Sequence, residues 1–351
     1  MISRTVLISQ QVCATIGRAV LMCFFACLMC HSMASQQPPV HTETPIIRTQ
    51  SSLVLLDVMG QDPKDGLPVR DFQKEDFRVF DNRQAVPIAT FDAGSASGKR
   101  PVVVWIVVIC NEEGKIGGSA NYAGKEALFR PALDHLDKRD EVGVAHWCDN
   151  GQTQLDLAPT ENRDQPLHVL AEVIRPIPFQ AGNSRSDEVG EVTFRKMIRL
   201  IIQDAHRRDP QPLPAIVFLD GDHTGQPIQE LNELVDDFLE TSGIVFGIKD
   251  SRYPWVMPLI GEHAQILHYM AKETGGQYLV ASPSGYASAL ESILIQLHFR
   301  YEIGFIPSAI DGKRHSLKVE LTQEARKKHN GVRLRFRPDY IPLTEAPAWA
   351  Q

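Results

Sequence analysis

The sequence predicts an α/β fold in which a doubly wound, mostly parallel sheet is inserted in a small antiparallel β sandwich formed by the flanking segments. Two observations support this fold. Between residues 101 and 298, apolar strand-like runs alternate with segments of helical periodicity. Before residue 92 and after residue 300, apolar residues recur with period two between turn residues. Three short strands at each end are too few for a core, so we expect the two ends to pair; separate packing of each end on the middle is the alternative.

The first 34 residues have the order of an export signal. Basic residues precede the apolar run Ala19–Met29, and Ser32-Met33-Ala34 supplies small residues for cleavage after Ala34. The apolar run is too short to cross a bilayer. Lipid attachment at Cys27 is the alternative to cleavage after Ala34. We therefore expect a periplasmic or extracellular protein with no transmembrane span in the mature chain.

The remaining chain divides into four segments. Residues 35–47 are polar and Pro-rich, which is typical of a disordered linker. Residues 48–92 form the N-terminal β segment, and residues 100–298 form the α/β domain. Residues 299–343 form the C-terminal β segment, which we expect to pack with 48–92.

The charge of the chain argues against a nucleic-acid partner. The formal net charge is −7, and loss of two arginines with the leader makes it −9. Arg333, Arg335 and Arg337 alternate along an expected strand, so we assign them to its solvated face and not to a phosphate-binding stripe.

The α/β domain contains strand-like and helical segments in alternation. Helical spacing is clear in two segments, around Met197 and Ile201 and around Leu234 and Phe238. An Asn-Gly pair at residues 150–151 predicts a tight hairpin between the second and third strands. The expected strands are Val102–Cys110, Val142–Cys148, Thr153–Leu157, Ala215–Leu219, Ile244–Ile248 and Gln277–Val280.

Several segments together resemble a von Willebrand factor type A domain of the bacterial VWFA-related kind common in acidobacteria. The matching segments are RDFQKEDFRVFDNRQAVPI, AGKEALFRPALDHLDKRDEVGVAHW, AIVFLDGDHTG, GIVFGIKD, MAKETGGQYLVAS and RYEIGFIPSAIDGKRHSLKVEL, which occur in this order. The resemblance covers nearly the whole mature chain. It implies a metal-ion-dependent adhesion site at the carboxyl ends of the strands, where hydroxyl and carboxylate oxygens hold Mg²⁺.

This chain departs from the implied metal site. The position of the first aspartate falls at Asn111, that of the first serine at Glu113, and that of the second serine at Lys115. Ser184 stands in the region of the middle threonine, and only Asp220 fits its position directly. A protonated lysine repels a cation, so we expect a degenerate site without a resident cofactor. Binding of Mg²⁺ or another divalent cation by the surrounding carboxylates is the alternative.

The same strand-end face offers groups for a protein ligand. Glu112 and Asp222 are acidic neighbours of the degenerate site, and Tyr253 and Trp255 form an apolar cluster after the fifth strand. No nucleophile elbow or zinc spacing occurs in the sequence. The sequence therefore predicts a secreted, non-enzymatic protein-binding or adhesion protein that uses this face.

Two other functions and one covalent feature stay open at this point. Asp220 and Asp222 also fit the Asp-x-Asp-x-Thr pattern of Mg-dependent phosphohydrolases, although that motif belongs after the first strand of its domain. A structural envelope component that binds through the sandwich is the other alternative. Cys110 and Cys148 are the only cysteines after the leader, and they are candidates for a disulfide or for two buried thiols.

Overall fold

The computed structural model describes residues 53–93, 99–110, 129–148, 153–173, 187–219, 226–251, 263–264 and 266–343. All of them belong to one compact unit, Ser51–Gln351. None of the helices in this described part of the chain is both long enough and apolar enough to cross a membrane.

A six-stranded sheet with the order β12-β10-β8-β5-β6-β7 forms the centre of the α/β domain. Neighbouring strands are parallel, except that β7 runs antiparallel to β6 at one edge, as the predicted hairpin requires. The strands are β5 (Val102–Cys110), β6 (Glu141–Cys148), β7 (Thr153–Thr160), β8 (Leu213–Leu219), β10 (Ile244–Asp250) and β12 (Tyr278–Ala281).

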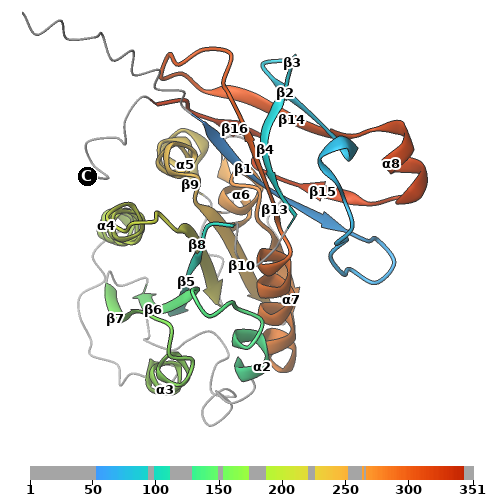
Figure 1. Ribbon diagram of the computed structural model, residues 1–351. Coiled ribbons are helices and arrows are strands. Elements are labelled where there is room, and N and C mark those ends of the chain that lie inside the picture. The colour runs from blue at the N-terminus through green and yellow to red at the C-terminus, as the bar shows by residue number, and fades with distance from the viewer. Residues whose placement is uncertain are drawn as a thin grey trace, which may run out of the picture. The chain divides into compact units, whose positions relative to one another are not determined.

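Helices cover both faces of this sheet (Figure 1). The continuous apolar run of β5 serves both faces, because successive side chains point to opposite sides. Val104 and Ile106 pack with the first set of helices, and Trp105 and Val107 pack with the second. The first set is α2 (Arg130–Leu133), α3 (Asp164–Val173) and α7 (Tyr286–His298), and the second is α4 (Asp187–His206), α5 (Ile228–Thr241) and α6 (Ile266–Glu273).

The two flanking segments interleave in two antiparallel sheets. One sheet has the order β15-β1-β13-β4 and the other β16-β14-β2-β3, so each contains strands from both ends of the unit. Phe72, Phe77 and Tyr301 lie in the core between them. The elements are β1 (Val54–Gln61), η1 (Lys74–Asp76), β2 (Phe77–Asp81), β3 (Gln84–Val86), β4 (Ile88–Asp92), β13 (Tyr301–Phe305), β14 (His315–Leu321), α8 (Gln323–Lys328), β15 (Arg333–Arg335) and β16 (Asp339–Tyr340).

The predicted fold class is therefore confirmed, and the alternative in which each end packs separately is wrong. The pairing of β1 with β13 and of β2 with β14 joins residues more than 200 positions apart. The N-terminal segment contains one break between strands that periodicity alone does not mark. Pro87 has no N–H for a ladder, and it separates β3 from β4, which belong to different sheets.

Buried ion pairs join the sandwich to the α/β domain where the chain crosses between them. Asp57 of β1 accepts hydrogen bonds from Arg100 Nη2 at 2.7 Å and from Arg300 Nε at 2.8 Å. Arg100 Nε also donates to Glu302 of β13 at 2.6 Å. Arg100 lies two residues before the start of β5 and Arg300 two residues after the end of α7, so both crossing points lie at the amino-terminal edge of the six-stranded sheet. The sandwich is therefore joined at this edge.

Candidate functional site

The carboxyl ends of three central strands meet at the edge opposite the sandwich junction. Val108 of β5 pairs in register with Leu219, the last residue of β8, and Leu219 pairs with Ile248 of β10. The polypeptide therefore leaves β5, β8 and β10 at one level of the sheet. In open α/β sheets, ligands bind in the crevice outside such strand ends. We take this carboxyl edge as the candidate site.

The side chains that the sequence assigns to this edge lie outside the described residues. This applies to every metal-site and partner-binding position: Asn111, Glu112, Glu113, Ser184, Asp220, Asp222, Tyr253 and Trp255. The described strand ends that precede Asn111 and Asp220 are neighbours in the sheet. Within the described residues, no group of three or more His, Cys, Asp or Glu side chains is placed to hold a metal ion.

The backbone register places the two candidate disulfide positions opposite each other. Cys110 ends β5 and Cys148 ends β6, and their Cα atoms are direct partners in the parallel ladder. Neighbouring strands lie about 4.8 Å apart, which falls within the Cα separations that disulfides span. The two cysteine side chains are not among those described.

A partly buried His–Asp pair lies next to this edge. His146 of β6 is in register with Val108, and its Nδ1 lies 2.9 Å and 3.0 Å from the two carboxylate oxygens of Asp156 on β7. Asp156 lies between Leu155 and Leu157, where the β6–β7 register shifts. The pair thus joins the edge strand to the sheet across an irregularity, and we assign it a structural role.

Sequence reasoning missed this pair, because it searched for metal-ligand spacing and not for a single His–Asp contact between neighbouring strands. The usable signal was the predicted hairpin at residues 150–151, which brings the segment around residue 155 opposite His146.

A second polar cluster lies inside the sandwich. His315 Nδ1 lies 2.9 Å from Asp81 Oδ1, and its Nε2 lies 3.1 Å from Asp311 Oδ1. Ser308 donates its backbone N–H to Asp81 Oδ2 at 2.8 Å. Burial raises the pKa of Asp81, but the bonds from Ser308, His315 and Tyr340 outweigh it and hold this pKa below its ordinary value. The cluster ties β2, β14 and β16 together.

Comparison with known proteins gives resemblance of fold only. No family model matches the sequence, and no curated protein matches it. Solved structures that resemble the chain include a von Willebrand factor type A protein from Catenulispora acidiphila, with 11% identity, 83% of this chain and 74% of that chain covered, and a TM-score of 0.38. BatB from Bacteroides thetaiotaomicron has 15% sequence identity and a TM-score of 0.33, and the match covers 57% of this chain and 97% of BatB. The SpRpn10 VWA domain has 13% sequence identity and a TM-score of 0.35, and the match covers 55% of this chain and 94% of that domain.

One sequence expectation about charge is wrong. Arg333 is exposed, but Arg337, which was expected on a solvated face, is only 6% exposed. The strand β15 ends at Arg335, so alternation along a strand no longer governs Arg337. Its guanidinium instead donates to the carbonyls of Leu239 at the end of α5 and of Leu55 in β1. Arg337 thereby fastens the sandwich to the α/β domain.

Proposed function

We propose that this protein is an exported, non-enzymatic binding protein related to the acidobacterial VWFA-related group, which holds a protein ligand at the carboxyl edge of the six-stranded sheet. The observation that carries the proposal is the common level of the ends of β5, β8 and β10, opposite the edge that is joined to the sandwich. Loops that follow such strand ends are the usual place for ligand recognition, because a rigid sheet positions them.

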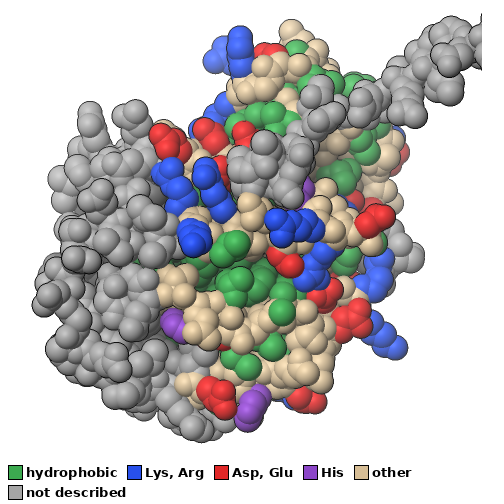
Figure 2. Space-filling view, turned by 90° about the vertical axis from the view of Figure 1, so that its left-hand side faces the viewer, with side chains coloured by type: hydrophobic (Ala, Val, Ile, Leu, Met, Phe, Trp, Pro, Cys, Tyr) green, Lys and Arg blue, Asp and Glu red, His purple; other side chains and the backbone are tan. Residues whose placement is uncertain are grey.

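The sequence of these loops favours a protein ligand. Glu112, Asp222, Tyr253 and Trp255 follow the strand ends, and acidic residues with aromatic anchors suit a partner that carries basic and apolar side chains. On the face shown in Figure 2, acidic and basic side chains of the described residues are interspersed around a group of hydrophobic ones. This mixed surface gives no support to nucleic-acid binding, which relies on a continuous basic surface.

A comparison of baits tests the proposal. The wild-type protein, an edge variant (Asp220→Ala with Trp255→Ala) and a sandwich variant (Arg326→Ala with Lys327→Ala on α8) are immobilised at equal density. Each is exposed to extract of the source cells, and retained proteins are quantified by mass spectrometry. We expect a partner whose capture falls at least about tenfold with the edge variant, a loss of about 1.4 kcal/mol in binding free energy, and stays unchanged with the sandwich variant. Loss with the sandwich variant alone would instead indicate a structural envelope component.

The proposed binding needs no resident metal ion. Calorimetric titration with Mg²⁺, Mn²⁺ and Ca²⁺ tests this part, with Asp220→Ala as the control. We expect no saturable binding up to millimolar metal, because Lys115 replaces a hydroxyl ligand of the implied site. Saturable binding that disappears in Asp220→Ala would contradict the degenerate site and would direct the search to carboxylate ligands. A phosphatase activity abolished by Asp220→Asn would contradict the non-enzymatic assignment.

A further inference from the structure

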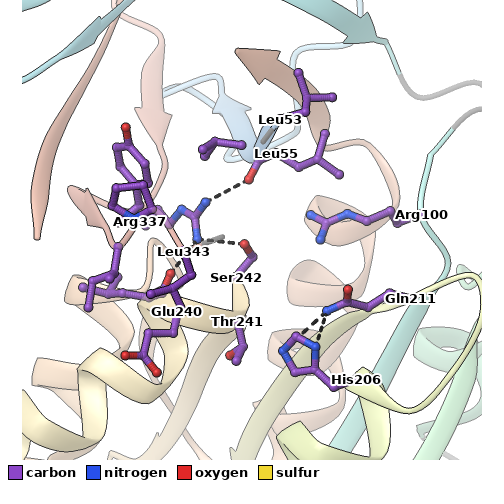
Figure 3. A pocket seen from close by; sticks show the side chains of 15 residues that line it. Leu53, Leu55, Arg100, His206, Gln211, Glu240, Thr241, Ser242, Arg337 and Leu343 are labelled. Carbon is purple, nitrogen blue, oxygen red and sulfur yellow. Dashed lines mark hydrogen bonds between the residues drawn. The ribbon is translucent and has the colours of Figure 1, made fainter. Parts of the chain in front are cut away.

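A cavity of about 280 Å³ lies at the junction of the sandwich and the α/β domain (Figure 3). It is open to solvent, and its size is at the lower end of the range for small-molecule pockets. Five segments line it: the start of β1, Arg100 before β5, the end of α4 with Gln211, the turn from α5 to β10, and residues 337–343. All of the lining side chains are described.

The cavity borders the buried positive charge of Arg337, which no carboxylate of the described residues contacts. The hydrogen bonds of the Arg337 side chain go to neutral acceptors, namely two backbone carbonyls and Ser242 Oγ at 2.9 Å, and its Nε has no partner. Within the described residues, Arg337 forms no ion pair. The carbonyl of Leu239 belongs to the last turn of α5, so the helix end supplies only a partial negative charge.

The neighbouring groups do not supply the missing negative charge. Three arginines at the junction, Arg100, Arg300 and Arg337, share two buried carboxylates, Asp57 and Glu302, and both carboxylates already bond to Arg100. Burial lowers the pKa of Arg337 to about 10; the attraction of Asp57 opposes this effect in part, and the repulsion of Arg100 adds to it. The guanidinium is therefore still protonated at neutral pH.

The remaining lining groups leave room for an anion. His206 contacts Gln211 and has a lowered pKa because of burial, so it adds no positive or negative charge at neutral pH. The Glu240 carboxylate points away from the cavity in Figure 3. A buried charge without a counterion is costly, so an anion held beside Arg337 is favoured.

The lining of the cavity also contains apolar side chains. Leu53, Leu239 and Leu343 are among them, and Leu53 is a large hydrophobic side chain that remains 40% exposed. Pockets that combine an apolar wall with a few convergent polar groups are typical of small organic ligands. We propose that this junction cavity binds a small organic carboxylate, whose charged group lies beside Arg337 and whose apolar body lies against Leu53 and Leu239.

The test uses sodium hexanoate as the probe and hexanamide as its uncharged counterpart, each titrated by calorimetry into the purified protein. We expect saturable hexanoate binding, with hexanamide at least about tenfold weaker, which corresponds to about 1.4 kcal/mol. Inorganic phosphate is titrated in parallel and is expected to bind more weakly than hexanoate, because it has no apolar body. The proposal would be overturned if hexanamide bound as tightly as hexanoate or if phosphate bound more tightly. It would also be overturned if hexanoate showed no saturable binding up to about 10 mM.

Variants locate the binding. Arg337→Met removes the charge, but it also removes bonds across the junction, so Leu53→Glu at the mouth of the cavity is the main variant. It adds a negative charge at an exposed position, and we expect it to weaken hexanoate binding at least about tenfold. Leu67→Glu is the matched control, because Leu67 is also an exposed leucine, at 53%, and does not line the cavity. Equal hexanoate affinity in Leu53→Glu and Leu67→Glu would overturn the assignment of the site.

Discussion

Replacement of Asp57 by asparagine tests the buried junction between the two parts of the fold. Asp57 is 6% exposed and bonds to both Arg100 and Arg300, which stand at the two points where the chain crosses between sandwich and sheet. Burial raises the pKa of Asp57, but Arg100 and Arg300 outweigh it, so this pKa lies below its ordinary value of 3.8. The carboxylate is therefore charged in the folded protein at neutral pH.

The size of the effect follows from what asparagine leaves behind. Its side chain has nearly the same shape, but it removes the negative charge from between two buried guanidinium groups. Breaking a buried ion pair by removal of one partner costs about 3–5 kcal/mol. With a urea dependence of about 3 kcal/mol per molar, the unfolding midpoint should fall by about 1.0–1.7 M urea.

Urea unfolding followed by circular dichroism measures this loss. Asp65→Asn is the matched control, because Asp65 is exposed and bonds only to the nearby N–H of Leu67, and its effect should stay within about 0.5 kcal/mol. A loss below about 1 kcal/mol for Asp57→Asn would refute the reasoning, since it would mean that the junction does not depend on this charge. The carboxylate contribution is present at neutral pH and is lost as the pH falls through the lowered pKa of Asp57.

Three further predictions concern other parts of the fold. Asp81→Asn should flatten the acid limb of the stability curve, because the lowered pKa of Asp81 makes wild-type stability fall as the pH drops below about 4; an unchanged curve would refute the role of this carboxylate. Gly276→Ala should lower the free energy of unfolding by about 3 kcal/mol or more, because the new Cβ would lie 1.8 Å from the Val245 carbonyl oxygen. Gly285→Ala is the control: its Cβ would meet nothing closer than 3.4 Å, so the loss should stay under about 1 kcal/mol. Cys110 and Cys148 should react with iodoacetamide only after reduction in protein from an oxidising compartment, and peptide mass spectrometry that finds both thiols free would exclude the disulfide.

The sequence predicted the fold well where periodicity carries the information. The side chains from Val102 to Ile109 are buried on both faces of the sheet, as the continuous apolar run predicts. Pairing of the two chain ends also followed from their length, since neither could build a core alone. The separation of β3 from β4 at Pro87 has a local signal as well, because proline has no N–H to donate to a ladder.

The sites were harder to predict because they depend on contacts between distant residues. Nothing local to Arg337 shows that its side chain meets the end of α5, so the alternation of three arginines was extended one position too far. The cavity at the junction likewise depends on residues from distant parts of the chain, such as 53–55 and 337–343, coming together. At the carboxyl edge, sequence reasoning identified candidate side chains, and the described strand ends give the common level from which their loops start.

Binding affinity at the carboxyl edge tests the central claim most directly. The partner recovered with the wild-type bait is titrated by biolayer interferometry against the wild type and the Asp220→Ala, Trp255→Ala double variant, each with and without EDTA. The account predicts a dissociation constant at least about tenfold weaker for the variant and no effect of EDTA on the wild type. Equal affinities for the two proteins would contradict binding at this edge, and loss of binding in EDTA would contradict a metal-free contact.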